Sequence, residues 1–238
     1  MRTIYLLLLL TLYFSCGKDK VIQLPEISHS KISEITDVSA AYIFYNETQP
    51  DRAELNRKNL ISTTNWLVNV DKRLSLKQVI PHIKFLQEKK GSSSHKNEKA
   101  KNYFTCSDTS AKNLGFIDFT DVVYHNDLTR LFNRKFTDNP TSEILIHVIA
   151  PDSIRIHFTA DQNENIGTTR YSNKENLKKD LSDVVFNGIS EDLKETGVIL
   201  YPGFHNNLSF QDYITIKSIL SAFKSDALII SNNEFIFN

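Results

Sequence analysis

The sequence predicts an α+β protein of two tandem two-layer domains, each a small mixed sheet with two helices packed on one face. Three observations lead to this prediction. Short runs of β-branched and aromatic residues alternate with amphipathic helical patterns along the chain. A strand-turn-helix pattern occurs once in each half. Hydrophobic residues make up 40% of the 238 residues, enough to fill two small cores.

Residues 1–15 have the pattern of a secretory signal peptide. Arg2 stands near the start, leucines fill positions 6–10, and the small residue Ser15 precedes Cys16. The apolar run at residues 4–15 has twelve residues, whereas a helix needs about 20 to cross a bilayer. We therefore expect this segment to direct export and to be removed.

The cysteine after Ser15 resembles the lipobox of bacterial lipoproteins, although Tyr13 stands where that family usually has Leu. The resemblance implies that Cys16 carries a diacylglyceryl thioether and becomes the mature N-terminus. Acyl chains contribute about 0.8 kcal/mol per buried methylene, so they anchor a protein in a membrane without a transmembrane helix. We expect an anchored protein of the bacterial cell envelope, in the outer membrane facing the periplasm or the surface in preference to the inner membrane. The alternative is an ordinary signal peptide followed by an incidental cysteine.

A polar segment at residues 16–35 predicts a tether, and a first domain is predicted at residues 36–138. The aromatic run "AAYIFYNET" from Ala40 predicts a strand. The stretch "RAELNRKNLIS" from Arg52 predicts a short helix, and "NWLVNV" from Asn65 predicts a second strand.

A longer helix is predicted from "LSLKQVIPHIKFLQEKK", with Ser75 as its N-cap. Pro81 lies inside this helix and is expected to bend it or to loosen one turn. Strands are predicted next at "YFTCS" and "GFIDFTDVVY", before a polar segment that ends at Pro140. The apolar face of the helix consists of Leu76, Val79, Ile80, Ile83 and Leu86.

The second domain is predicted at residues 139–238. The runs "EILIHVIA" and "SIRIHFTA" predict two strands that can form a hairpin. A helix at "NKENLKKDLSDVVFN", a strand at "GVILYPGF" and a helix at "LSFQDYITIKSILSAF" follow, and "ALIIS" and "EFIF" predict the last strands. The first of these helices has one apolar face, formed by Leu177, Leu181, Val184 and Val185.

The strand-turn-helix that begins at Asn65 recurs at Ile199, a separation of 134 residues. At this separation Leu74 and Ser75 fall on Leu208 and Ser209, and the polar turn has the same place in both copies. Such a repeat predicts two independently packed modules. Ile83 falls on Lys217 and does not fit, whereas the matching apolar positions are Leu76, Val79, Ile80 and Leu86 on Phe210, Tyr213, Ile214 and Leu220.

The order strand, helix, strand, polar turn, helix, strand resembles the periplasmic domain of the ExbD/TolR family. The resemblance lies at residues 68–71 with 74–86, and more fully at 176–231, where "LKKDLSDVV", "GVILYPGFHNNLSFQDYITIKSIL" and "ALIIS" occur in order. It implies a two-layer fold in the cell envelope that docks to an envelope protein or to peptidoglycan. Family members that couple to a proton gradient have a transmembrane helix with an embedded Asp. This sequence shows no such helix, so the resemblance does not imply proton-driven force transduction.

No motif for catalysis or cofactor binding is present: CxxC, HExxH, GxGxxG, the P-loop and GxSxG are all missing from the sequence. Asp161, Asn163 and Asn165 alternate as in a calcium loop, but the Gly and Glu that an EF-hand loop requires are replaced. His147 and His157 lie in strand patterns, where we expect a structural role. We therefore expect no catalytic residue, no metal and no cofactor.

We do not expect a nucleic-acid partner, because the chain has no excess of positive charge: Lys plus Arg and Asp plus Glu each number 28. The only cysteine besides Cys16 is Cys106, in a β-rich run. We expect its side chain to be a small buried hydrophobe, and we expect no disulfide within the chain once Cys16 carries lipid.

Two functions of different class follow from these observations. The first, which we favour, is a non-catalytic envelope lipoprotein whose tandem domains dock to an envelope protein or a cell-wall partner, with the membrane bound through the N-terminal lipid. The second is a lipid-anchored hydrolase or glycan-handling enzyme with a site assembled from distant residues, such as His205, Asp71 and Asp212.

A binding face is expected at the two polar turns, because loops at matching positions of both copies can form one composite surface. The plainer interpretation is that both are solvated turns. The residues of this predicted face are Asp71, Lys72, Arg73, His205, Asn206 and Asn207.

Overall fold

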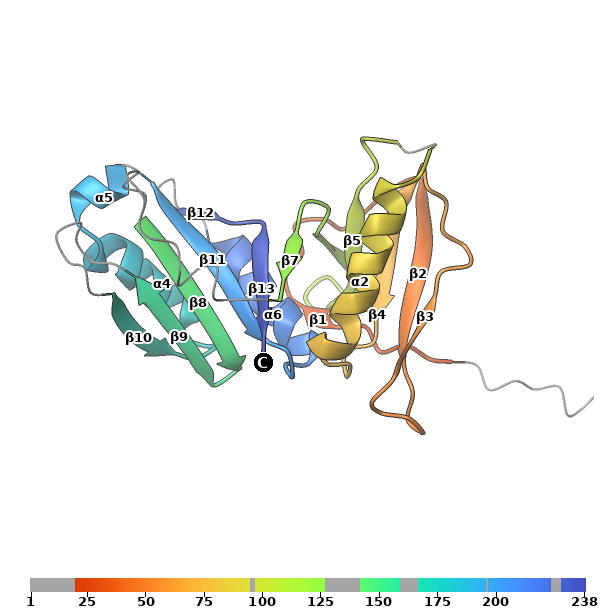
Figure 1. Ribbon diagram of the computed structural model, residues 1–238, viewed down its shortest axis with the longest axis horizontal. Coiled ribbons are helices and arrows are strands. Elements are labelled where there is room, and N and C mark those ends of the chain that lie inside the picture. Colours follow the sequence, from red (N-terminus) through yellow and green to blue (C-terminus); the bar gives the residue numbers. More distant parts are fainter. Residues whose placement is uncertain (1–19, 95–96, 127–141, 159–166, 196, 224–227) are drawn as a thin grey trace, which may run out of the picture.

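The computed structural model describes residues 20–94, 97–126, 142–158, 167–195, 197–223 and 228–238. Within these residues the chain forms two mixed β-sheets with helices packed against them, which confirms the predicted α+β class. Figure 1 shows the two sheets side by side. None of the described helices is long and apolar enough to cross a bilayer. The predicted signal peptide, Cys16 and the residues at 161–165 that resemble a calcium loop lie outside the described residues.

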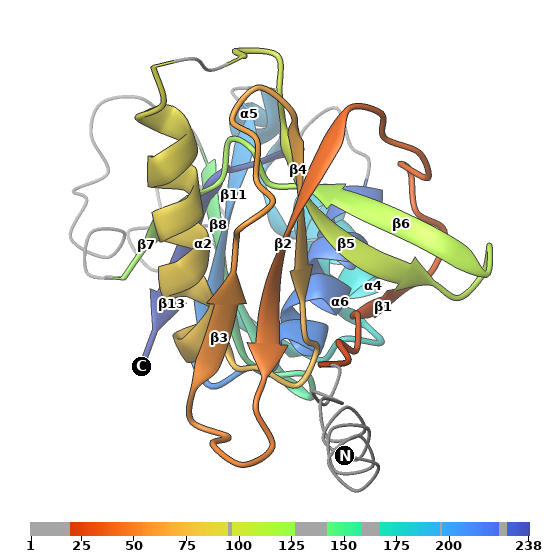
Figure 2. The same cartoon turned by 90° about the vertical axis from the view of Figure 1, so that its right-hand side faces the viewer.

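The first sheet contains β1 (Glu26–Ile27), β2 (Val38–Tyr45), β3 (Ala53–Asn56), β4 (Asn65–Val70), β5 (Asn102–Asp108) and β6 (Asn113–Asp118). Its strand order is β1-β5-β4-β2-β3, with β6 paired to β5. The strands β1, β5, β4 and β2 are parallel, whereas β3 and β6 are antiparallel to their neighbours. The helix α2 (Leu76–Gly91) connects β4 to β5 and lies along this sheet (Figure 2).

The second sheet contains β7 (Val123–His125), β8 (Ser142–Ala150), β9 (Ser153–Phe158), β10 (Thr168–Ser172), β11 (Val198–His205), β12 (Leu228–Ile230) and β13 (Asn233–Phe237). Its order is β10-β9-β8-β11-β13-β7, with β12 paired to β11. The connection from β10 to β11 contains α4 (Leu177–Asp183), the π-helical turn η2 (Val184–Gly188) and α5 (Glu191–Glu195). The helix α6 (Phe210–Ala222) follows β11.

The two sheets have the same strand order and the same strand directions. Written from one edge, the first reads β1-β5-β4-β2-β3 and the second reads β7-β13-β11-β8-β9. In each, the first four strands are parallel and the fifth is antiparallel to the fourth. The helices α2 and α6 have equivalent places after β4 and β11. The units differ in their other elements. Among the described strands, only the first unit has β6, paired to β5, and only the second has β12, paired to β11. The second also has β10, α4, η2 and α5, which stand where the first unit has only a short connection from β3 to β4.

The local sequence explains the central strand and helix of the first unit. Trp66, Val68 and Val70 of β4 are buried and alternate along the strand, so they form the face of β4 that packs on the core. The helix α2 starts after the predicted N-cap Ser75 and continues past Pro81, so the proline does not end it. The residues predicted to form its apolar face are all buried, namely Leu76, Val79, Ile80, Ile83 and Leu86.

Several local predictions are wrong. The segment from Arg52 was predicted as a helix, but Ala53–Asn56 forms the edge strand β3, because antiparallel pairing with β2 outweighs the helical propensity of Ala, Glu and Leu. The run "GFIDFTDVVY" was predicted as one strand but contributes β6 to the first sheet and β7 to the second. The strand β10 was not predicted.

Two short strands, β1 and β7, lie outside the predicted limits of the domains to which their sheets belong. The strand β1 lies within residues 16–35, which were predicted as a tether, and it pairs with β5 of the first sheet. The strand β7 lies within residues 36–138, which were predicted as the first domain, and it pairs with β13 of the second sheet. The chain therefore enters the second sheet before residue 138.

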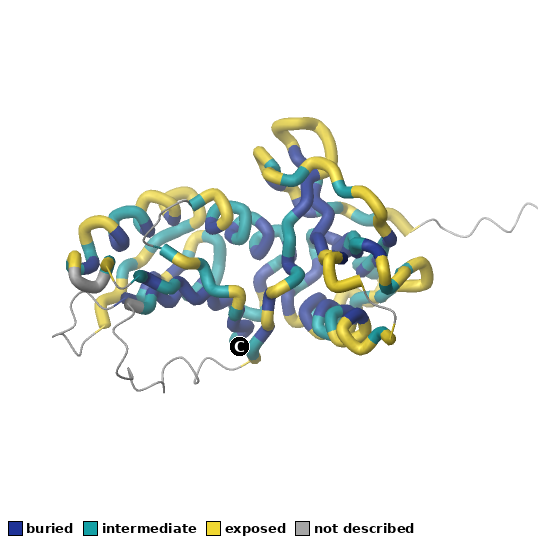
Figure 3. The backbone as a smooth tube through the Cα atoms, turned by 90° about the horizontal axis from the view of Figure 1, so that it is seen from above, coloured by how far each residue is buried: buried dark blue, intermediate teal, exposed yellow. Residues whose placement is uncertain are grey.

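One hydrophobic core extends through both units. At its centre the ring of Phe104, on β5, stacks on Phe119 with 3.9 Å between ring centroids. The same ring meets two side chains of α6 edge-on, Phe210 at 5.2 Å and Tyr213 at 6.2 Å. Figure 3 shows buried segments in both halves and in the region where they meet. The two sheets therefore pack as one body.

Candidate functional site

The two polar turns predicted as a binding face meet each other in the structure. The turn after β4 and the turn after β11 form an antiparallel β-bridge between Ser75 and Ser209. These two serines are the matching residues of the repeat, 134 positions apart. A bridge between equivalent residues means that the two turns are related by a local two-fold axis at this point.

Four backbone hydrogen bonds form this junction, in two reciprocal pairs. The N–H of Leu76 donates to the carbonyl of Leu208 at 2.9 Å, and the N–H of Phe210 donates to the carbonyl of Leu74 at 2.6 Å. The N–H of Lys77 donates to the carbonyl of Asn206 at 2.8 Å, and the N–H of Gln211 donates to the carbonyl of Lys72 at 3.1 Å. Within each pair, the two donors are 134 residues apart and the two acceptors are also 134 residues apart. Each bond is therefore the counterpart of the other in the repeat.

The donors of these bonds are the first-turn amides of α2 and α6. Such amides have no acceptor within their own helix, and leaving one buried without a partner costs about 1–3 kcal/mol. Side chains at the caps provide further partners. The amide oxygen of Gln78 accepts from the backbone N–H of Ser75 at 2.9 Å, and the hydroxyl of Ser209 accepts from the backbone N–H of Asp212 at 3.1 Å. Each helix therefore completes its start with carbonyls from the other unit.

Asp71 is a fully buried carboxylate in the polar turn that follows β4. Its Oδ1 accepts from the backbone N–H and the Nε of Arg73 at 3.1 and 2.9 Å. Its Oδ2 accepts from Nη2 of Arg73 at 2.9 Å and from the N–H of Gln23 at 3.2 Å. Burial alone raises the pKa of Asp71, but the hydrogen bonds from Arg73 and Gln23 outweigh burial and hold that pKa below its ordinary value.

His205, at the polar turn that follows β11, is the residue that matches Asp71 in the repeat, and it makes the corresponding contact. Its Nδ1 accepts from the N–H of Asn207 at 3.2 Å, just as Asp71 accepts from the N–H of Arg73. Its ring lies edge-on to Phe237 with 5.5 Å between centroids. Position 71 and position 205 therefore require a side chain that accepts a hydrogen bond from the backbone two residues later, and both Asp and His satisfy this requirement.

The remaining residues of the predicted face also bind within the molecule. Lys72 pairs with Glu26 of β1 at 2.6 Å, and the side chain of Asn206 donates to the side-chain oxygen of Asn238 at 2.5 Å. The guanidinium of Arg73 lies 4.4 Å from the ring centroid of Tyr45. The structure thus brings the two turns together through their backbones, whereas these polar side chains bind partners within their own unit.

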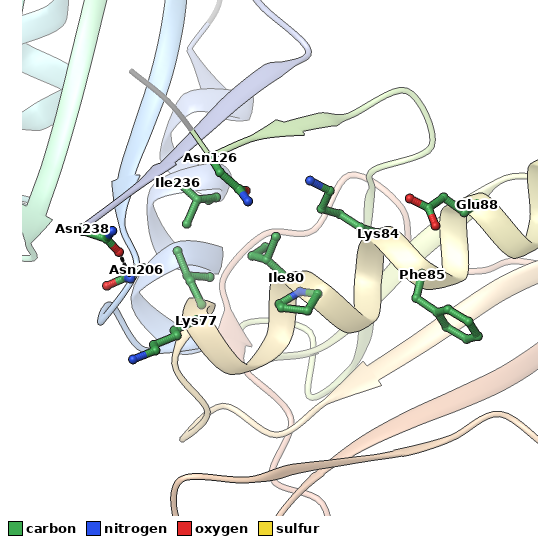
Figure 4. Close-up of a pocket in the computed structure, with 11 residues that line it drawn as sticks. Lys77, Ile80, Lys84, Phe85, Glu88, Asn126, Asn206, Ile236 and Asn238 are labelled. Atoms are coloured by element: carbon green, nitrogen blue, oxygen red, sulfur yellow. Dashed lines mark hydrogen bonds between the residues drawn. The ribbon is translucent and has the colours of Figure 1, made fainter. Parts of the chain in front are cut away.

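A groove of about 440 Å³ opens beside this junction, between α2 and the end of β13. Figure 4 shows Ile80 and Ile236 pointing toward each other in this groove, with Lys84 and Asn126 nearby and Phe85 pointing away. The groove combines an apolar floor with cationic and amide groups at its rim. Its lining consists of Leu76, Lys77, Ile80, Pro81, Lys84, Phe85, Glu88, Asn126, Asn206, Ile236 and Asn238.

A buried ion pair joins α6 to β13. Lys217 pairs with Glu234, whose other carboxylate oxygen accepts from the hydroxyl of Tyr213 at 2.7 Å. That hydroxyl also lies 3.0 Å from the hydroxyl of Tyr124 on β7. Burial first, and then the carboxylate of Glu234, raise the pKa of both tyrosines. This network attaches the short strand β7 to the second unit.

The ion pair explains the one mismatch in the sequence repeat, Lys217 against Ile83. The first unit has an apolar side chain at that helix position, whereas the second unit has a cation together with a carboxylate on the adjacent strand. Sequence analysis did not identify the pair. The signal that could have revealed it is a charged residue in each of two otherwise apolar patterns, "ITIKSIL" and "NEFIF".

Two of the histidines lie together on the second sheet. His147 of β8 and His157 of β9 have ring centroids 5.0 Å apart, and Nδ1 of His157 lies 2.7 Å from the hydroxyl of Thr169. Burial, followed by the charges of His157 and Arg155, lowers the pKa of His147 to about 4, so this side chain is neutral at pH 7. Within the described residues, no group of three or more His, Cys, Asp or Glu side chains could hold a metal ion.

The residues suggested for an enzymatic site each have a local partner. Asp71 binds Arg73, Asp212 binds Ser209 at the start of α6, and His205 binds the backbone of its own turn. Cys106 is buried, as predicted, and burial raises the pKa of its thiol to about 12, so the thiolate is a minor form at neutral pH.

Comparisons with protein-family models, with curated proteins and with solved structures found no match to this chain. The assignment of function therefore depends on the residues and geometry described above.

The buried ion pair predicts a non-additive response to mutation. Lys217→Met leaves the carboxylate of Glu234 buried without its cation and should lower the free energy of unfolding by about 3–5 kcal/mol. Adding Glu234→Leu to Lys217→Met removes both charges and should restore most of that loss, because the first unit has an apolar residue at the equivalent helix position. Urea denaturation measures all variants. A double variant as unstable as Lys217→Met would contradict this prediction.

The environment of Asp71 predicts a pH-dependent contribution to stability. The pKa of Asp71 is lower in the folded protein than in the unfolded chain, so its stabilising effect is present above about pH 3.8 and is lost as the pH falls through the folded value. Asp71→Asn should therefore lower the free energy of unfolding by about 1–3 kcal/mol at pH 7, and by less in strong acid. The exposed partner of Arg73 provides a control, Glu47→Gln, with a smaller effect. A deficit in Asp71→Asn that did not change with pH would count against this explanation.

Proposed function

We propose that this protein is a non-catalytic lipoprotein of the bacterial cell envelope, in which a diacylglyceryl group on Cys16 holds a rigid body at a membrane and the body docks to an envelope protein or to the cell wall. The observation that carries the proposal is the junction of the two turns. Reciprocal hydrogen bonds and a shared core fix the two units against each other. A body of this kind presents one constant surface to a partner, as a docking scaffold requires.

The carboxylates with shifted pKa values support a structural use of charge. Among the described residues these are Asp71, Asp108 and Asp118, and for all three the pKa is lowered. Asp108 accepts from the hydroxyl of Ser110 and the N–H of Ser30, both at 2.6 Å. Asp118 accepts from the hydroxyl of Thr120 at 2.6 Å. A general acid or base works best when its pKa is near the operating pH. Carboxylates whose pKa is lowered are better suited to accept hydrogen bonds that stabilise turns.

The sequence pattern supports the envelope location. The leader at residues 1–15 and the cysteine that follows it favour export and lipidation. The resemblance to the ExbD/TolR periplasmic domain favours docking within the envelope, and it depends on the order of elements, which the second unit has more fully than the first because, in the described residues, the first unit has no helix before β4. On this proposal the groove beside the junction and the surfaces around the two turns are the first places to seek a partner.

Lipidation is tested by the mature N-terminus. The full chain, expressed in a bacterium that processes lipoproteins, should yield a membrane-bound protein whose first residue is Cys16 with a diacylglyceryl group, as read by mass spectrometry. Cys16→Ala should move the protein out of the membrane fraction, whereas the matched variant Cys106→Ala should leave its location unchanged. A mature chain that starts elsewhere, with a free thiol at residue 16, would overturn the proposal.

A further inference from the structure

The segment between Cys16 and the folded body is far shorter than the sequence suggested. Lys20 pairs with Glu54, and its Nζ lies 5.9 Å from the ring centroid of Phe44. Three residues later, the carbonyl of Gln23 accepts from the N–H of Lys72 at 2.8 Å. The strand β1 then joins the first sheet. The folded body therefore extends at least as far as Lys20, four residues after the cysteine.

Four residues set a strict limit on the distance between lipid and body. A fully extended chain spans at most about 3.3–3.6 Å per residue, so Lys20 lies within about 14 Å of Cys16. The polar layer on each side of a bilayer core is about 5–8 Å thick. A diacylglyceryl group on Cys16 places that residue at the inner boundary of this layer. The body then stands within about 10 Å of the headgroup surface, which limits the orientations that it can adopt.

The surface around Lys20 has the composition of a membrane-contacting surface. We call it the Phe44 patch, defined as Lys20, Tyr42 and Phe44, and Val21 follows Lys20 in the chain. The side chain of Val21 is 77% exposed. Tyr42 and Phe44 are half-buried on the outer face of β2, with stacked rings 5.8 Å apart, while Ala41 and Ile43 between and beside them face the core.

Each member of the Phe44 patch suits the headgroup region. Aromatic rings are favoured at the boundary between hydrocarbon and water, and Tyr offers a hydroxyl to the wet side. The stem of Lys20 packs on the ring of Phe44, and its ammonium, paired with Glu54, lies on the wet side of the patch. We propose that the Phe44 patch lies against the headgroups of the bilayer in which Cys16 is anchored. This inference rests on the proposed lipidation of Cys16.

A fluorescence quenching experiment tests the inference on the lipidated full chain. An environment-sensitive fluorophore is attached at Val21→Cys, or at Tyr171→Cys as a matched control. Val21 and Tyr171 are similarly exposed, at 77% and 74%, and Figure 1 shows β10, which carries Tyr171, at the opposite end of the molecule from β2. The native Cys106 is buried, with a thiol pKa raised to about 12, so the reagent selects the introduced cysteine. The probe membrane is a phosphatidylethanolamine and phosphatidylglycerol vesicle with nitroxide-labelled headgroups.

We expect quenching at position 21 to be several-fold stronger than at position 171. Equal quenching at both positions, in protein that floats with the vesicles, would overturn the contact while leaving lipidation intact. Protein that does not float, with an unmodified Cys16 by mass spectrometry, would overturn the proposed function and this inference together. The two failures are therefore distinguishable.

A variant with a longer tether isolates the effect of chain length. Twenty Gly and Ser residues inserted between Gly17 and Lys18 add a flexible chain with a root-mean-square length of about 25 Å. Flotation should be unchanged, because the lipid is unchanged. Quenching at position 21 should fall toward the level at position 171. Quenching that stayed at its original level would contradict the claim that the short tether holds the patch on the membrane.

Discussion

The structure depends on the first-turn amides of α2 and α6, which need acceptors that their own helices cannot supply. Each helix finds them in the turn that precedes the other helix, so neither unit completes its helix start alone. The bridge between Ser75 and Ser209 lies at the centre of this exchange, and the ring of Phe104 continues the contact into the core of the second unit. The hydrogen bonds that these helix-start amides require are thus the contacts that orient the two sheets relative to each other.

The same requirement explains which side chains differ between the units. Asp71 and His205 both accept from a backbone N–H two residues later, and Gln78 and Asp212 both bind the serine at the helix start. The acceptor function is kept while the residue type changes. The polar turns are therefore explained first by the assembly of the chain. The proposed docking role uses the surfaces that remain around them, on a body that the proposed lipid holds close to a membrane.

Much of the fold could be predicted from the sequence because its central elements have strong local signals. Ser75 and Ser209 mark the starts of two amphipathic helices, and the repeat places the turns at matching positions. Other elements had no such signal. The strands β1 and β7 have two and three residues, too short for any periodicity, and only pairing with β5 and β13 defines them. The edge strand β3 has the composition of a helix and takes its conformation from β2. The ion pair of Lys217 and Glu234 depends on two residues brought together by packing.

Hydrogen exchange at the amides of Leu76, Lys77, Phe210 and Gln211 tests the central claim most directly. If the reciprocal bonds join the two units, all four amides should exchange slowly, with opening free energies close to each other and to that of global unfolding. First-turn amides exposed to water exchange at nearly the rate of an unfolded chain. Fast exchange at these four positions, with slow exchange at Val79 and Tyr213 deeper in the same helices, would contradict the account.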